Sequence, residues 1–174
     1  MKFKNVFKLT VAIAMCEFAG VVGSIFTAKA IPAWYAALAK PFFNPPAWIF
    51  APVWTALYAL MGISFFLIWS VAPAHNKNQH SNILQNVGMF RARRWAMFLF
   101  FIQLFLNTIW SIIFFGLQSP LWALGDIILL WIVILCTIII FYKISKPAAY
   151  LLLPYLVWVS FAMYLNFSIW HLNI

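Results

Sequence analysis

The sequence has few charged residues and almost no acidic ones. Only 7% of its 174 residues are charged, and Glu17 and Asp126 are the only acids. A soluble domain carries roughly 25% charged residues, because water must solvate most of its surface. The shortage of charge therefore excludes a soluble enzyme. The 67% hydrophobic content excludes an intrinsically disordered chain.

Motifs of conventional catalysis and of metal binding are also absent from the sequence. Its two cysteines, Cys16 and Cys136, lie in separate apolar runs, which excludes a CxxC pair and a disulfide framework. No GxxxxGK[ST], GxGxxG or HExxH pattern occurs, so neither a nucleotide-binding loop nor a zinc-protease site is expected. We predict no metal site and no required cofactor.

Long apolar runs are what the sequence has in abundance. Five are long enough to cross the hydrocarbon core, which takes about 20 residues of helix. They cover residues 9–27, 48–72, 95–117, 121–142 and 148–172. Lipid requires backbone polar groups to bond internally, and the runs lack the alternation of barrel strands, so each is predicted to be a helix. We expect one all-α integral membrane domain over residues 1–174, a bundle of five transmembrane helices.

The basic residues predict the orientation of these helices. Nine of the eleven flank the runs on one side, and only Lys29 and Lys40 lie on the other. The nine are Lys2, Lys4, Lys8, Lys77, Arg91, Arg93, Arg94, Lys143 and Lys146. Because basic loops stay in the cytoplasm, the N-terminus is predicted to be cytoplasmic and the C-terminus outside in a bacterial inner membrane. The formal net charge is +9, but the basic residues flank the apolar runs and do not form a patch. No nucleic-acid partner is therefore expected.

Aromatic and polar residues recur at helical spacing in three of the runs. Gln103, Asn107 and Ser111 lie four residues apart and so share one helix face, with Trp110 beside it. The second and fifth runs carry similar stripes, made of Trp54, Tyr58, Met61 and Phe65, and of Tyr155, Trp158, Ala162 and Asn166. One such stripe is typical of ordinary helix packing. Three together predict a shared aromatic cavity for a flat apolar ligand with a polar edge.

Both acids lie inside apolar runs, where an ionisable group is costly unless it is paired or functional. Neither Glu17 nor Asp126 has a basic residue three or four positions away, so a partner must come from another helix. A polar contact between helices and a functional role are both open, but two isolated acids are too few for a proton relay. The small residues of the first run, Gly20, Gly23 and Ser24 among them, suit close helix packing.

Residues 34–46 read WYAALAKPFFNPP and residues 52–62 read PVWTALYALMG. These two stretches resemble the TspO/MBR family of tryptophan-rich sensory proteins and mitochondrial translocator proteins. The stretch LNTIWSIIFFG at 106–116 is similar to the family's third helix, and PYLVWVSFAMYLN at 154–166 to its fifth. With Asp126 in register as well, the resemblance covers nearly the whole chain in order.

The resemblance implies a five-helix bundle, often a homodimer, that binds porphyrins and other apolar ligands beneath its first loop. Carried over by position, the ligand-contact residues are Tyr35, Trp54, Tyr58, Asn107, Trp110, Ser111, Trp158 and Ala162. The implied lid loop contains Trp34, Lys40, Pro41, Pro45 and Pro46, with a short helical turn at 34–38. Trp54 and Trp158 match positions implicated in the family's proposed light-dependent porphyrin breakdown. In a eukaryote, the resemblance implies the mitochondrial outer membrane.

Some features depart from the family pattern. Phe43 stands where relatives often carry Trp in the loop. The cholesterol-recognition pattern of animal members is not met, because Leu165 is followed by Phe167 and His171 instead of a tyrosine and a basic residue. The polar run at 75–82 has no functional interpretation.

We therefore expect a membrane-embedded binding protein for porphyrins or other tetrapyrroles, acting as a sensor, carrier or scavenger. Light-dependent porphyrin degradation by pocket tryptophans is the alternative from the enzyme class. A transporter component and a ligand-free scaffold also stay open, although five helices without an internal repeat lack the paired halves of common transporters. The expected partners are a porphyrin or other apolar small molecule, membrane lipid and a second copy of the chain.

Overall fold

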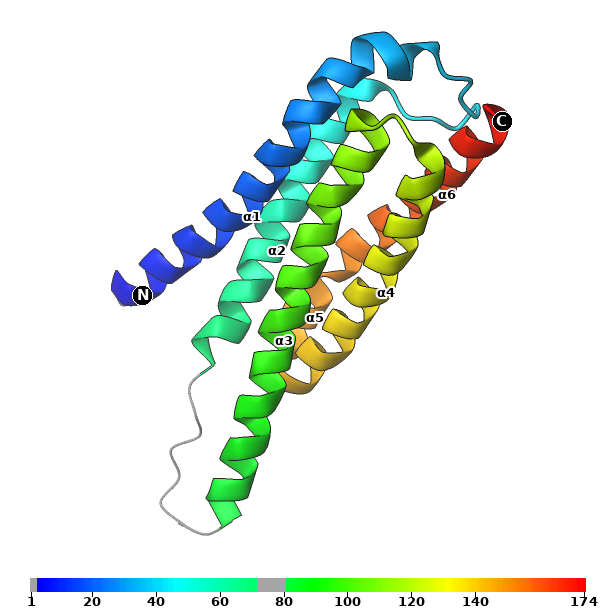
Figure 1. The fold of residues 1–174 in the computed structure, drawn as a ribbon. Helices are drawn as coiled ribbons and strands as arrows, with labels where there is room; N and C mark the ends of the chain where they lie inside the picture. Colours follow the sequence, from blue (N-terminus) through cyan, green and yellow to red (C-terminus); the bar gives the residue numbers. More distant parts are fainter. Residues whose placement is uncertain (1–2, 72–80) are drawn as a thin grey trace.

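Five long apolar helices run through the structure, a computed structural model that describes residues 3–71 and 81–174, the side chains of 81–86 excepted (Figure 1). The first three are α1 (Phe3–Ala30) with η1 (Ile31–Tyr35), η2 (Ala47–Ile49) with α2 (Phe50–Ser70), and α3 (Ser81–Ser111) with η3 (Ile112–Gly116). The others are α4 (Pro120–Ile144) and the pair α5 (Lys146–Leu151) and α6 (Leu153–Leu172).

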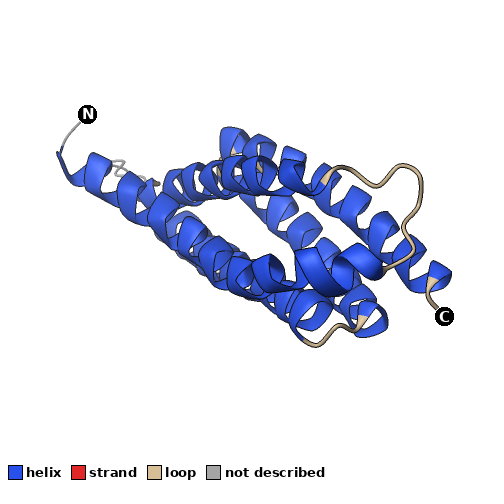
Figure 2. Cartoon of the chain, turned by 90° about the horizontal axis from the view of Figure 1, so that it is seen from above, coloured by secondary structure: helices blue, strands red, loops and turns tan. Residues whose placement is uncertain are grey.

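Five segments have the length and apolar composition of membrane spans, which confirms the predicted fold. They are Phe3–Tyr35, Ala47–Ser70, Val87–Gly116, Pro120–Ile144 and Lys146–Leu172. Within the described residues every regular element is a helix and there is no strand (Figure 2). This is the arrangement that lipid imposes, because a helix satisfies its own backbone hydrogen bonds.

The helices extend beyond the predicted apolar runs. Helix α3 begins at Ser81 instead of residue 95. Arginine has a high helix propensity, and the polar first turns of α3 can form a helix outside the hydrocarbon core. The expected separate turn at 34–38 is instead the end of the first helix, which continues through the π-helical η1. Pro32 lies in that wide turn, where a regular α-helix would bring its ring against a preceding carbonyl.

The fifth run is two helices, where the sequence analysis expected one at 148–172. α5 and α6 are separated by Leu152, and each carries a proline, Pro147 or Pro154, in its first turn. Proline is tolerated there because its missing N–H would have no partner in the helix. Ser64 donates a hydrogen bond of 2.7 Å to the carbonyl of Ala148 and so ties α5 to α2.

Helices α1 and α2 pack most closely at Gly62. A Cβ atom at this position would lie 2.6 Å from the Cα of Ile13, so only glycine permits the approach. Farther along, the ring of Tyr58 rests against the backbone of Gly20. Beyond Tyr58 the two helices separate, and the space between them becomes part of a cavity.

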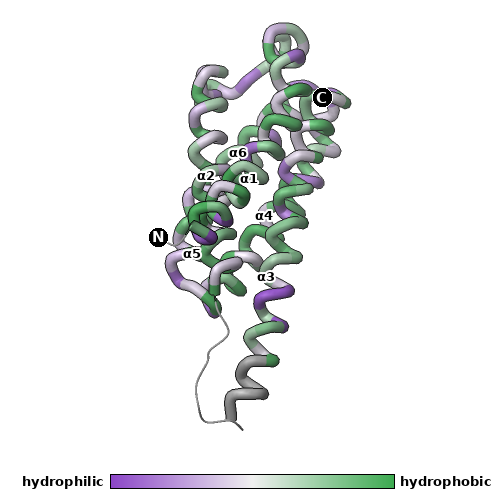
Figure 3. Tube along the Cα trace, turned by 90° about the vertical axis from the view of Figure 1, so that its left-hand side faces the viewer, coloured by the Kyte–Doolittle hydropathy of each residue, from purple (hydrophilic) through white to green (hydrophobic). Residues whose placement is uncertain are grey.

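All the described basic residues except Lys29 and Lys40 gather at one end of the bundle, here called the basic end. Helices α1 and α3 and the short α5 begin there, and α2 and α4 end there; the hydrophilic stretch of α3 is visible in Figure 3. Arg93 donates hydrogen bonds of 2.6 and 3.2 Å to the carbonyls of Trp69 and Val71, satisfying the end of α2. Lys2 and Lys77 lie outside the described residues, as does the polar run 75–82 apart from the first backbone positions of α3.

Candidate functional site: an aromatic cavity between four helices

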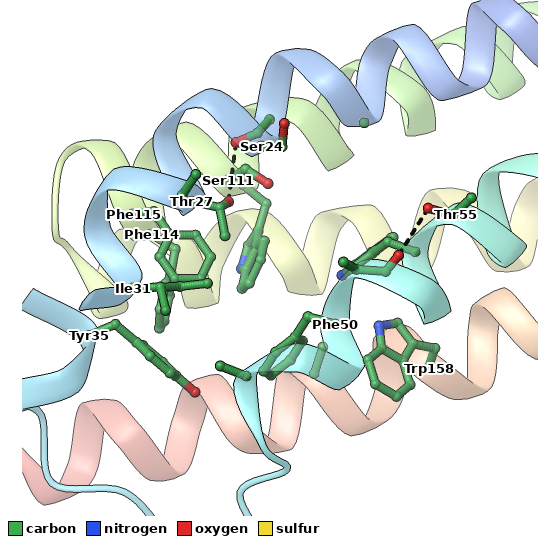
Figure 4. Close-up of a pocket in the computed structure, with 18 of the residues that line it drawn as sticks. Ser24, Thr27, Ile31, Tyr35, Phe50, Thr55, Ser111, Phe114, Phe115 and Trp158 are labelled. Atoms are coloured by element: carbon green, nitrogen blue, oxygen red, sulfur yellow. Dashed lines mark hydrogen bonds between the residues drawn. The ribbon is translucent and has the colours of Figure 1, made fainter. Parts of the chain in front are cut away.

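A cavity of about 370 Å³ lies between α1, α2, α3 and α6, toward the end of the bundle opposite the basic end. This volume falls within the roughly 300–1,000 Å³ that is typical of small-molecule sites. Figure 4 shows side chains from these helices and from η1 and η3 converging on it. The elements themselves bring the residues together, so the cavity does not depend on a long loop.

Small side chains form the α1 wall of the cavity. Gly20, Gly23, Ser24, Thr27 and Ala28 share one helix face and line the cavity. A Cβ atom on Gly23 would lie only 3.0 Å from the hydroxyl oxygen of Ser111 on α3. Because these side chains are small, α1 leaves space for the cavity, and the aromatic side chains of the other helices surround this space.

Aromatic rings make the remaining walls. Trp110 stacks on Phe114 with their centroids 5.1 Å apart and their planes at 22°. Trp54 and Tyr58 lie one turn apart on α2 with centroids at 5.5 Å. Across the cavity, Trp158 contacts Phe50 edge-on at 6.2 Å (Figure 4). Such rings present flat faces and edges that favour offset stacking with another aromatic system.

Two hydrogen bonds fix the ring of Trp110. The indole N–H of Trp110 donates to Asn166 over 3.1 Å, and the amide of Asn166 donates to the carbonyl of Pro120 over 2.8 Å. These two bonds join α3, α6 and the first residue of α4. The rotamer of Trp110 is therefore set by the fold before any ligand arrives.

A second buried network lies under the α2 wall. Tyr58 donates its hydroxyl proton to the side-chain oxygen of Asn107, and the amide nitrogen of Asn107 donates to the hydroxyl of Tyr155 over 3.0 Å. Asn107 is 3% exposed. It joins α2, α3 and α6 from behind the phenol ring of Tyr58.

The cavity opens between α1 and α2, where the bundle faces lipid. On α1, Val21 is 57% exposed, and Ser24 and Ala28 are exposed as well. On α2, Ala51 and Thr55 are also exposed, although all five residues line the cavity. A ligand dissolved in the bilayer has a lateral route into the site.

Seven of the eight predicted ligand-contact residues line this cavity. They are Tyr35, Trp54, Tyr58, Trp110, Ser111, Trp158 and Ala162. The eighth, Asn107, does not line it and lies one turn closer to the basic end, in the network behind Tyr58. The helical spacing that grouped Asn107 with Ser111 gave the correct face of α3, but it does not say where along that face the cavity ends.

The predicted lid residues Trp34, Lys40, Pro41, Pro45 and Pro46 lie outside the cavity lining. Trp34 packs edge-on against Phe114 at 5.6 Å, and the ammonium group of Lys40 lies 4.9 Å from the centre of the Tyr35 ring. Tyr35 itself donates to the side chain of Asn44 over 2.7 Å. The loop thus supports Tyr35 from outside, and Tyr35 carries the contact with the cavity.

The C-terminus holds this loop in place. The side-chain oxygen of Asn173 accepts from the backbone N–H of Ala39 at 3.0 Å, and its nitrogen donates to the carbonyl of Ala39 at 3.0 Å. Figure 1 shows the first loop reaching the C-terminal end of α6. Phe43, the departure from the family pattern, stacks on Tyr164 of α6 at 5.1 Å.

Several lining residues were not predicted to contact the ligand. They are Glu17, Ser24, Thr27, Phe114 and Phe115. The signal for Glu17 was an acid within an apolar run, and the signal for Ser24 was the run of small residues in α1, which was interpreted as a helix-packing motif. Among the described residues, no three His, Cys, Asp or Glu side chains gather as a metal site would require.

The comparisons with known proteins agree with this architecture. Residues 12–171 match the TspO/MBR family. The chain is 46% identical to the tryptophan-rich protein TspO of Chlorobaculum tepidum, over 98% of both chains, and 45% identical to that of Archaeoglobus fulgidus, over 97% of this chain and 99% of the other. It is also 36% identical to the human translocator protein, over 87% of this chain and 82% of the human one. The chain therefore belongs to the TspO/MBR family.

Proposed function

We propose that this protein binds porphyrins, or other flat apolar molecules, in the cavity between α1, α2, α3 and α6. The observation that carries the proposal is the aromatic wall, in which Trp54, Trp110 and Trp158 come from three different helices. A flat macrocycle gains contact area from such rings by offset stacking. The opening between α1 and α2 admits a ligand that partitions into the bilayer and lets one edge of a large ring extend beyond the cavity.

A role as sensor, carrier or scavenger follows from reversible binding of such a ligand in a membrane. The human relative's name, translocator protein, supports a carrier role. In our proposal the basic end faces the cytoplasm of a bacterial cell, which places the cavity in the outer half of the membrane. A homodimer stays a prediction that follows from the family resemblance.

The experiment is a titration of purified protein in phosphatidylcholine nanodiscs with protoporphyrin IX, in the dark, followed by tryptophan fluorescence. We expect saturable quenching at micromolar or lower porphyrin, because several indoles lie against the bound ring. Empty nanodiscs containing free N-acetyltryptophanamide are the control for partition into lipid. Quenching that rises without saturation would contradict the proposal.

Light-dependent breakdown of the porphyrin is the second candidate function. It is supported by the placement of Trp54 and Trp158, whose oxidisable indoles both line the cavity. The excited macrocycle and dioxygen would supply the chemistry, so the protein's part is to hold the indoles against the ligand. This activity stays a prediction that depends on binding.

A further inference from the structure

Glu17 is the only charged side chain among the described residues that line the cavity. It lies on α1 at the inner end of the cavity, the part nearest the basic end, which Glu17, Gly20 and Tyr58 form. The side chain is partly exposed. The only other acid, Asp126, is on α4 and does not line the cavity.

No described residue pairs with the Glu17 carboxyl group. The nearest basic residues on α1, Lys8 and Lys29, are both more than two helical turns away. The other described basic side chains belong to the ends of the bundle. A carboxylate at such depth in a membrane is costly unless a complementary group reaches it.

Five of the six hydroxyl groups that line the cavity donate to other protein acceptors, and the sixth, Ser111, lies beside Gly23, six residues along α1 from Glu17. Ser24 donates to the carbonyl of Val21 at 2.7 Å, and Thr55 to that of Ala51 at 3.0 Å. Tyr58, the nearest phenol, donates to Asn107. Thr27 and Tyr35 donate to Gly23 and Asn44. The lining therefore leaves Glu17 as a strong acceptor whose hydroxyl neighbours have already used their protons.

One buried donor also lacks a partner. The indole nitrogen of Trp158 on α6 forms no hydrogen bond within the described part of the chain, although the atom is buried. The cavity lining thus includes two residues, Glu17 on α1 and Trp158 on α6, whose polar groups the described protein leaves unmatched, although the indole nitrogen itself is buried. Buried polar groups are normally satisfied, so a ligand that bonds to the carboxyl group of Glu17 gains from the match.

We propose that Glu17 makes this cavity select ligands that carry a protonated amine at its inner end. The inference rests on the proposed function, because it takes the cavity to be the ligand site. A charge-assisted hydrogen bond to the carboxylate gives the amine its advantage.

The test compares three porphyrins in phosphatidylcholine nanodiscs. They are protoporphyrin IX dimethyl ester, the bis-amide of protoporphyrin IX with ethylenediamine, and the same bis-amide with both amines acetylated. The last two differ in the positive charge and share the macrocycle and the linkage. We expect the wild-type protein to bind the free amine at least about tenfold more tightly than the acetylated form, the factor that one hydrogen bond to a charged group gives.

The Glu17→Gln variant should lose this preference and bind the free and the acetylated amine with equal affinity, and saturable binding of either form shows that its cavity is intact. Asp126→Asn removes the other acid outside the cavity and should keep the preference. An equal affinity of the wild type for the free and acetylated amines would overturn the inference, as would a preference that survives in Glu17→Gln. If none of the three porphyrins binds saturably to the wild type, the proposed function itself fails.

Discussion

Replacing Ala162 by Phe is expected to abolish tight porphyrin binding. Ala162 is 9% exposed and lines the cavity from α6. A phenyl ring at this position projects into the 370 Å³ that the ligand needs. We expect the dissociation constant for protoporphyrin IX to rise at least about 100-fold, which corresponds to the upper part of the 1–3 kcal/mol that overpacking costs.

The matched control is Val157→Phe on the same helix. Val157 is 68% exposed and does not line the cavity, so the added ring faces lipid. Its porphyrin affinity, measured by the same quenching titration, should equal that of the wild type. An Ala162→Phe variant that is folded and still binds like the wild type would show that the porphyrin occupies another site.

The largest loss of stability is expected from Asn107→Leu. The amide of Asn107 accepts from Tyr58 and donates to Tyr155, whose hydroxyl is fully buried. Leucine leaves both tyrosine hydroxyls without this partner, and each unsatisfied buried group costs about 1–3 kcal/mol. We expect the free energy of unfolding to fall by about 2–6 kcal/mol, measured by denaturation in detergent with circular dichroism.

A comparison with Tyr155→Phe separates the network from general packing. That variant removes one of the two hydrogen bonds and leaves the bond between Tyr58 and Asn107 in place. It should cost less than half as much as Asn107→Leu. Equal losses of unfolding free energy in the two variants would mean that the hydrogen bond between Tyr58 and Asn107 does not stabilise the protein, which would contradict the network. Because Asn107 lies behind Tyr58, its replacement should weaken porphyrin binding less than Ala162→Phe does.

The number and type of helices follow from the sequence because lipid allows few alternatives. An apolar run of sufficient length has to be a helix, so five runs give five spans. The ends of the helices were harder to predict, since Arg91, Arg93 and Arg94 continue α3 beyond the apolar run. The break at Leu152 had a local signal in Pro147 and Pro154, which the apolar composition of the fifth run concealed.

The aromatic residues that line the cavity could be predicted from the sequence, whereas the lining residues of α1 could not. Large side chains at helical spacing, such as Trp54 and Tyr58, indicate which face of a helix points inward. On α1 the same face carries Gly20, Gly23 and Ser24, which are equally typical of close helix packing. Glu17 therefore looked isolated in the sequence. Only the three-dimensional arrangement shows that it shares a cavity with Trp158.

The lid role of the first loop stays a prediction, because the contacts of the loop do not test it. The prolines of the loop indicate a stiff segment, and the family resemblance made it a lid. In the structure the loop is fixed by Tyr35, Asn44 and Asn173, and its prolines lie outside the lining. Sequence spacing does not reveal contacts between residues as distant as Ala39 and Asn173.

The most direct test of the central claim is protection of a cysteine placed inside the cavity. Ala162→Cys would be made in a Cys136→Ala background, where the remaining Cys16 is fully buried. The rate of modification by an uncharged maleimide is then measured in nanodiscs with and without protoporphyrin IX, with Val157→Cys as the lipid-facing control. We predict that the porphyrin slows modification of Ala162→Cys and leaves that of Val157→Cys unchanged. Equal rates for Ala162→Cys with and without saturating porphyrin would contradict binding in this cavity.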